Sequence, residues 1–466
     1  MSKSQGPNPK PHSPGQAPRP SGIPQPSLGA RILSSIGHWS LVIGHWTLDI
    51  GHWSFLIPYL ALAILLLPAI QPLLTTDFTC GYDNGFHLWR AVQIARCLRQ
   101  GILYPRWAPD MAHGYGVPLF IFHPPLTAYA AALLNLLGLS WPLAINATFA
   151  LGMLLAGLFT FIFVRDLFGP AAGLVAAVAY VFAPFQAYDV FNRGSLSESF
   201  AWVFPPLLLW ALHRWSARGE YRFLPVAALG LAGFILTHNL FAFLFAPLLA
   251  GWVILEGWLA RDWRAIGRGA LAGALGLSLC TFFWLPGLAE RGWVQTDRLL
   301  GTWVFDYRNN FLDLRQLLAL PRATDPALLN DWPPKALGLL PALVALLPLA
   351  RWRRLTRQAR WRVALLLGST VVFAGLTLPF SRPVWDHVPL LSYVQFPWRF
   401  LGPAAFCAAI LAGAFVARDQ PPASNLQSHL LSSSQPRSSS PCSSWATWAG
   451  SIPATPPPPG TPPSPG

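Results

Sequence analysis

The sequence predicts an all-α polytopic membrane protein with about ten transmembrane helices, each needing roughly 20 apolar residues. Of its 466 residues, 53% are hydrophobic and only 11% are charged, whereas soluble domains carry roughly a quarter charged residues. Apolar runs of spanning length recur between Leu56 and Val416. Arginines gather in the short loops between them, as the positive-inside rule describes. That pattern explains the net charge of +14 without a nucleic-acid partner.

Both ends of the chain predict disordered tails. Residues 1–55 begin with a Pro/Ser-rich stretch and continue with heptads that start Gly-His-Trp at Gly37, Gly44 and Gly51. So few copies favour a low-complexity extension over a repeat fold, although the His and Trp residues also suit an interfacial or metal-binding segment. Residues 418–466 are Ser/Pro-rich. They form a tail, or a disrupted reading frame, which an intact frame in the underlying locus would exclude.

The transmembrane domain is predicted over residues 56–417. The apolar piece Leu126–Leu139 is too short to span and is expected to be a re-entrant or surface-lying helix. With a cytoplasmic N-terminus, the arginine-rich loops face the cytoplasm and most of the 18 acidic residues lie outside. The expected spans are 56–74, 142–164, 171–188, 199–213, 223–238, 240–260, 267–288, 335–350, 362–380 and 398–417.

Two of the expected extracytoplasmic loops are long, at about 75–141 and about 289–334. The first contains an amphipathic stretch, Phe86–Leu98, and then several Pro- and Gly-rich turns. Prolines and glycines at this density indicate an ordered loop path. We therefore expect a long first outer loop that carries amphipathic helices.

Gly81 to Arg90 holds the strongest chemical signal. Asp83, His87 and Arg90 are spaced i, i+4, i+7 and share one face of a helix. Asp-Asn-Gly is also a common turn and helix cap, so a capping role for Asp83 is the alternative. A short outer loop ends in a second carboxylate, Glu198. Carboxylates from two loops can divide base and orienting roles, or hold a divalent cation such as Mg or Mn.

Further polar and aromatic residues on the outer side complete the predicted site. Arginines recognise phosphate oxygens in bidentate fashion, and tryptophans can stack on a sugar. The alternatives are interfacial anchoring by Trp, a structural histidine and a snorkelling arginine. The predicted catalytic residues are Asp83 and Glu198, and the predicted substrate-binding residues are His87, Arg90, Arg106, Trp107, Arg193, His238 and Arg399.

The segment Asp83–Arg90 resembles the Asp-x-x-x-x-His-x-x-Arg type motif in the first external loop of oligosaccharyltransferase catalytic subunits, which are GT-C glycosyltransferases. Together with Tyr104–Trp107, Gly114-Tyr-Gly, Arg193–Glu198 and Gln395–Arg399, it is similar to a bacterial family of membrane proteins with a 6-pyruvoyl-tetrahydropterin synthase-related domain. Soluble pterin synthases use a His-x-His zinc element, which this sequence lacks. The family label therefore predicts no pterin chemistry here.

The resemblance implies a GT-C-like fold in a bacterial plasma membrane, with an extracytoplasmic active site and a polyprenyl-phosphate sugar donor. It implies that Asp83 is the base or metal ligand and that Glu198 is the second acidic position. Ser-Leu-Ser-Glu stands where those enzymes carry an Asp-x-Glu pair, which leaves metal dependence open. A membrane transporter or flippase of lipid-linked glycans, and an inactive family member, are the alternative functions.

Overall fold

The computed structural model describes residues 41–43, 46–48, 50–79, 81–295, 298, 302–320 and 335–417, with side chains from Leu56 onward. The chain divides into two units, 1–418 and 419–466. The second unit lies outside the described residues, as do most of the predicted N-terminal tail and residues 321–334 of the second outer loop. Within the heptad region, β1 (Leu41–Ile43) and β2 (Trp46–Leu48) form an antiparallel pair.

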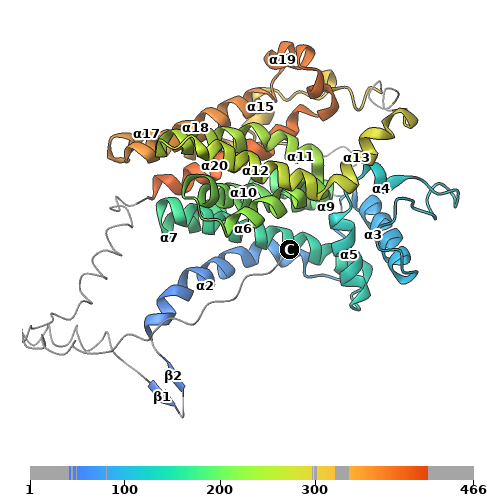
Figure 1. Ribbon diagram of the computed structural model, residues 1–466, viewed down its shortest axis with the longest axis horizontal. Helices are drawn as coiled ribbons and strands as arrows, with labels where there is room; N and C mark the ends of the chain where they lie inside the picture. Colours follow the sequence, from blue (N-terminus) through green and yellow to red (C-terminus); the bar gives the residue numbers. More distant parts are fainter. Residues whose placement is uncertain are drawn as a thin grey trace, which may run out of the picture. The chain divides into compact units, whose positions relative to one another are not determined.

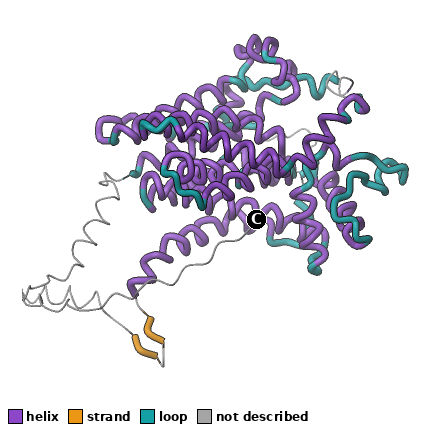
Figure 2. The backbone as a smooth tube through the Cα atoms, viewed as in Figure 1, coloured by secondary structure: helices purple, strands orange, loops and turns teal. Residues whose placement is uncertain are grey.

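All other named elements of the described chain are helices joined by turns and loops (Figures 1 and 2), which confirms the all-α prediction for this part. The helices are α2 (Ile50–Ile70), α3 (Asn84–Arg99), α4 (Leu119–Phe122), α5 (Leu126–Leu136), α6 (Trp141–Phe168), α7 (Pro170–Val181), α8 (Pro184–Ala187), α9 (Leu196–Ala201), α10 (Phe204–Leu212), α11 (Phe223–Ala260), α12 (Arg264–Leu279), α13 (Thr281–Ala289), α15 (Leu314–Leu317), α16 (Leu339–Val344), α17 (Leu347–Ala350), α18 (Arg357–Gly375), α19 (Arg382–His387) and α20 (Leu401–Phe415). Short 3₁₀ and π turns join them, among them η2 (Tyr188–Arg193) and η9 (Pro397–Phe400).

Helix α20 lies at the centre of the core. It is apolar on every side and is buried along its described length, against α7, α18, α16 and α17. A helix that is hydrophobic all round must be surrounded by other helices or by lipid. Small residues allow the closest approach: Gly413 abuts the Ala172 carbonyl of α7.

Helix α11 is continuous in sequence but broken in geometry. Its 38 residues would extend about 57 Å if straight, roughly twice the thickness of a bilayer core. His238 interrupts it with φ −158° and ψ 91°, outside the helical region. The break lies where the sequence predicts two separate spans, 223–238 and 240–260.

The number of transmembrane spans stays a prediction. Four described helices are long and apolar enough to cross a membrane, and three bent helix pairs raise this to seven if each pair is one span. The other predicted spans, 199–213, 240–260 and 335–350, lie mainly on helices that are shorter or joined. Helix α5 has 11 residues, which agrees with the expected short helix, and its surface-lying or re-entrant position stays a prediction.

The first of the predicted outer loops is ordered around α3, which begins two residues before the expected amphipathic stretch and ends one residue after it, at Arg99. Its apolar face packs Ile94 and Ala95 with Ala128 and Ala132 of α5. The coil from α3 to α4 is coloured teal in Figure 2. It is tied to α3 through the amide of Gln93, which donates to Asp110 at 3.0 Å and accepts from the Asp110 amide.

Candidate active site

Two loops far apart in sequence meet at the start of α3. The Asp83 amide donates to the Arg193 carbonyl at 2.8 Å. Gly81 and Gly194 lie face to face, and a Cβ on Gly194 would come within 2.9 Å of the Gly81 Cα and 2.5 Å of the Asn84 side-chain oxygen. Gly194 also has φ +69°, which favours glycine. These two glycines allow the Asp83 and Arg193 backbones to approach.

Arg193 is the centre of the polar cluster. Its Nε lies 3.3 Å from Asp83 Oδ2, and its Nη1 lies 3.2 Å from Asp189 Oδ1 and 2.7 Å from Glu198 Oε2. The guanidinium also lies 5.2 Å from the centre of the Trp398 ring. One buried cation therefore joins three carboxylates, from the N-cap of α3, from η2 and from α9.

Glu198 is fully buried and has two further polar neighbours, a guanidinium and an imidazole. Arg399 Nε lies 3.4 Å and His238 Nε2 lies 3.6 Å from Glu198 Oε2. Arg399 sits in η9 and donates to the Val394 carbonyl, whereas His238 sits at the break of α11. The His238 Nδ1 accepts from the Phe241 amide at 3.0 Å, which caps the second half of α11 and turns Nε2 toward Glu198.

His87 links α3 to α9. Its Nε2 accepts a hydrogen bond from the Leu196 amide at 3.2 Å, so the ring is unprotonated at that nitrogen. Burial and the nearby Arg90 guanidinium lower the pKa of His87 well below its usual value. His87 is therefore a neutral group at physiological pH that positions the α9 turn.

Asp83 and Arg90 are the more accessible members of the site. The Asp83 side chain is 27% exposed, and it makes no capping hydrogen bond to α3. Burial raises the pKa of Asp83 above its ordinary value, against the opposing effect of Arg193 and Arg90. Burial also lowers the pKa of Arg90 to about 10, and among the described residues its buried Nε has no hydrogen-bond partner.

Two predicted substrate-binding residues lie apart from this cluster. Arg106 forms an ion pair with Glu290, in which both side chains are more than a third exposed. Trp107 packs against Gly116. A Cβ on Gly116 would clash with the indole nitrogen of Trp107. These partners lie in the predicted outer loops, and within the described part of the chain no hydrogen bond or ion pair joins Arg106 or Trp107 to Asp83, Arg193 or Glu198.

Sequence reasoning missed Asp189, Trp398 and Lys335. Asp189 is fully buried and pairs with Arg193 at i, i+4 across a π turn. The Lys335 ammonium lies 4.9 Å from the centre of the Trp398 ring, on which Arg193 also stacks. A carboxylate four residues before Arg193 was the available signal for Asp189. Lys335 follows a stretch outside the described residues and carried no such signal.

A divalent cation between Asp83 and Glu198 stays a prediction, and the side chains around these carboxylates do not fit one. The Arg193 guanidinium occupies the space between them and binds both. Across the described chain, no three His, Cys, Asp or Glu side chains are grouped to hold a metal ion. Carboxylates already paired with guanidinium groups offer few free oxygens for the six or more that such cations bind.

The fold and the cluster together define a polytopic helical protein with a buried ionic site at helix ends. The chain belongs to the family described as "6-pyruvoyl-tetrahydropterin synthase related domain; membrane protein", whose model matches residues 120–421. This confirms the family expected from the sequence motifs and the membrane class of the protein.

The chain is similar to two further proteins, one of which has been solved in two states. An uncharacterized protein of Lactococcus lactis subsp. cremoris (strain MG1363) is 23% identical over 237 residues, which are 49% of this chain and only 39% of that protein. ArnT from Cupriavidus metallidurans bound to undecaprenyl phosphate is 17% identical with a TM-score of 0.48, covering 80% of this chain and 62% of ArnT. The apo state of ArnT is 16% identical with a TM-score of 0.35, and 77% of each chain is covered.

Proposed function

We propose that this protein is an integral membrane glycosyltransferase that transfers a sugar from a polyprenyl-phosphate carrier to an extracytoplasmic acceptor. The observation that carries the proposal is the Arg193 cluster, in which a partly exposed carboxylate, Asp83, is held beside buried carboxylates and guanidinium groups. The motif likeness of Asp83–Arg90 to oligosaccharyltransferases supports the same reaction class. Such a reaction needs a base for the acceptor and positive charge for the departing phosphate.

In the proposed reaction, Asp83 accepts the proton of the acceptor hydroxyl. The hydroxyl oxygen bonds to the anomeric carbon while the bond from that carbon to the carrier phosphate oxygen breaks, and the polyprenyl phosphate leaves with the bonding electrons. A raised pKa suits Asp83 to this role, because a general base works best when its pKa approaches the working pH. Asp83 is also the most exposed of the three carboxylates.

The cations divide the remaining roles. Arg193 is committed to three carboxylates, so we assign it and Glu198 to holding Asp83 in place. Arg90 keeps an unbonded Nε near Asp83, and we assign it to the departing phosphate, which guanidinium groups bind in bidentate fashion. His238 and Arg399 contact Glu198 and hold it in place.

A transporter or flippase of lipid-linked glycans is the second candidate. The break of α11 at His238, beside the buried Glu198, favours it, because transporters place binding groups at interrupted helices. Chemistry distinguishes the two. Transfer breaks the bond between sugar and phosphate, whereas transport leaves it intact.

The full chain, reconstituted in liposomes with a polyprenyl-phosphate sugar labelled in the sugar, tests the proposal. We expect free polyprenyl phosphate and labelled acceptor to form in equal amounts. Labelled sugar that crosses the bilayer still attached to its carrier would instead establish the transporter. Protein inactivated by heat gives the background for both measurements.

A further inference from the structure

A second polar feature lies at the other end of α20 from the Arg193 cluster. Arg399 lies two residues before the start of α20, and the carbonyl of Phe415, the last residue of α20, accepts a hydrogen bond from Arg351 at 2.7 Å. Fifteen helical residues separate these ends by about 22 Å at 1.5 Å per residue. The segment around Arg351 is therefore on the opposite side of the core from the candidate active site.

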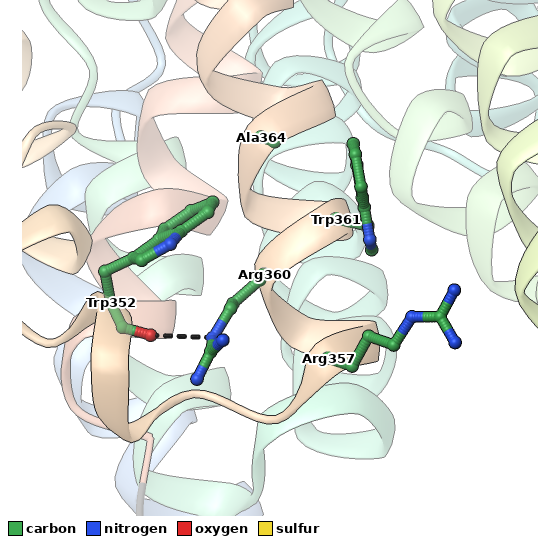
Figure 3. A pocket seen from close by; sticks show the side chains of 5 residues that line it. All are labelled: Trp352, Arg357, Arg360, Trp361 and Ala364. Atoms are coloured by element: carbon green, nitrogen blue, oxygen red, sulfur yellow. Dashed lines mark hydrogen bonds between the residues drawn. The ribbon is translucent and has the colours of Figure 1, made fainter.

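This end of the molecule contains a cavity of about 220 Å³, lined by Trp352, Arg357, Arg360, Trp361 and Ala364 (Figure 3). Figure 3 shows Arg360 reaching toward the Trp352 carbonyl, with Trp361 and Arg357 on the other side. A cavity lined by tryptophans and arginines combines an apolar wall with positive charge.

The cavity arginines are held in place, and their positive charges are not neutralised. Arg360 donates through Nε to the Trp352 carbonyl and through Nη2 to the Arg353 carbonyl, both at 2.9 Å. Carbonyl partners orient the guanidinium without neutralising it. Arg357 is exposed and lies 5.4 Å from the centre of the Trp258 ring. Neither arginine has an ion pair with a described carboxylate, whereas their neighbour Arg362 binds both oxygens of Glu256.

The surrounding residues match the depth of a membrane interface. Trp258 of α11 and Trp361 of α18 pack edge to face at 5.0 Å, and both are more than a third exposed. Tryptophans gather at the level of lipid headgroups. The segment 351–362 holds six arginines and no acidic residue, which is the kind of cluster that attracts anionic lipid.

We propose that the cavity of Trp352, Arg357, Arg360 and Trp361 binds the phosphate headgroup of an anionic phospholipid. The two guanidinium groups bind the phosphate oxygens, and the indole rings contact the glycerol and first methylenes of the chains. The lipid is the preferred source of phosphate because the cavity opens beside apolar helices with exposed tryptophans. This inference does not depend on the proposed glycosyltransferase activity.

Native mass spectrometry of the purified full chain tests the site. The probes are phosphatidylglycerol and phosphatidylcholine with identical acyl chains. We expect the wild type to prefer phosphatidylglycerol, and we expect R357Q/R360Q to bind it about tenfold more weakly, because charge-assisted hydrogen bonds are lost. R357Q alone, which keeps the Arg360 hydrogen bonds, should show a smaller loss and a wild-type melting temperature.

The matched control is R261Q/R264Q. These two arginines are exposed in another predicted cytoplasmic loop, and no ion pair is recorded for them among the described residues, so the charge change is the same. The control should retain wild-type lipid binding. An equal loss in the control, or no preference between the two lipids in the wild type, would overturn the site. Displacement of the lipid by excess inorganic phosphate would show instead a site for a soluble phosphate.

Discussion

Replacing Arg193 by glutamine should destabilise the protein more than any single loss of a surface charge. The variant leaves Asp189, which is 0% exposed, without any ion pair recorded among the described residues. Glu198 keeps Arg399 and His238. Leaving a buried charge unpaired costs about 3–5 kcal/mol. The shift is about 2–4 °C per kcal/mol for 150–250 residues and smaller for longer units, and this unit spans residues 1–418, so the melting temperature should fall by several degrees.

Thermal unfolding of the purified protein in one detergent measures this effect. The control is R106Q, the same substitution in the half-exposed pair with Glu290, which should cost less than about 1 kcal/mol. Adding D189N to R193Q should recover part of the loss, because the two residues share an interaction. The account of Arg193 is wrong if R193Q melts within about 2 °C of R106Q, since the stated penalty requires a larger difference.

Three further outcomes follow from the site. Gly194→Ala should lower the melting temperature and the transfer rate, because its Cβ would clash with Gly81 and Asn84, whereas Gly101→Ala shares a positive φ but has no atom within 4 Å of its Cβ position. Similar losses in both variants would attribute the effect to φ alone. Transfer should fall as pH falls through the raised pKa of Asp83, so the acid limb should lie above the ordinary value of 3.8; a limb at or below that value would contradict the assignment of Asp83 as base. Transfer should persist in excess EDTA. Loss of transfer in EDTA, with recovery on adding Mg or Mn, would instead support the predicted metal site.

Much of the helical framework could be read from the sequence, because apolar runs and loop arginines are local signals. The break at His238 illustrates this: the sequence placed a hinge there between two spans, and the backbone leaves the helical region at that residue. The amphipathic stretch that became α3 was found for the same reason. The spacing of its apolar residues is a property of that helix alone.

The partners of each charge could not be read in this way, because they depend on contacts between distant segments. Spacing grouped Asp83 with His87 and Arg90, and the structure places His87 and Arg90 in α3 and Asp83 at its N-cap. It could not show that Arg193, more than a hundred residues later, would contact Asp83 through a pair of glycines. It also grouped Arg106 with the site, whereas Glu290 from the second outer loop pairs with it.

The capping alternative for Asp83 is decided by geometry rather than by pattern. Asp83 stands at the N-cap position of α3, as an Asp-Asn-Gly sequence suggests, yet its side chain makes no hydrogen bond to the helix. The carboxylate is turned to Arg193 instead. Its position is therefore that of a cap, and its contacts are those of an ionic site.

The most direct test of the account compares Asp83→Asn with Asp77→Asn in the reconstituted transfer assay. Asp77 is an exposed carboxylate in the same outer loop, six residues earlier, with no ion pair recorded among the described residues. Removing a general base should slow transfer by about 10²–10⁴-fold, while the Asp77 variant should retain the wild-type rate. Equal rates for both variants, with both proteins folded, would contradict a catalytic role for Asp83.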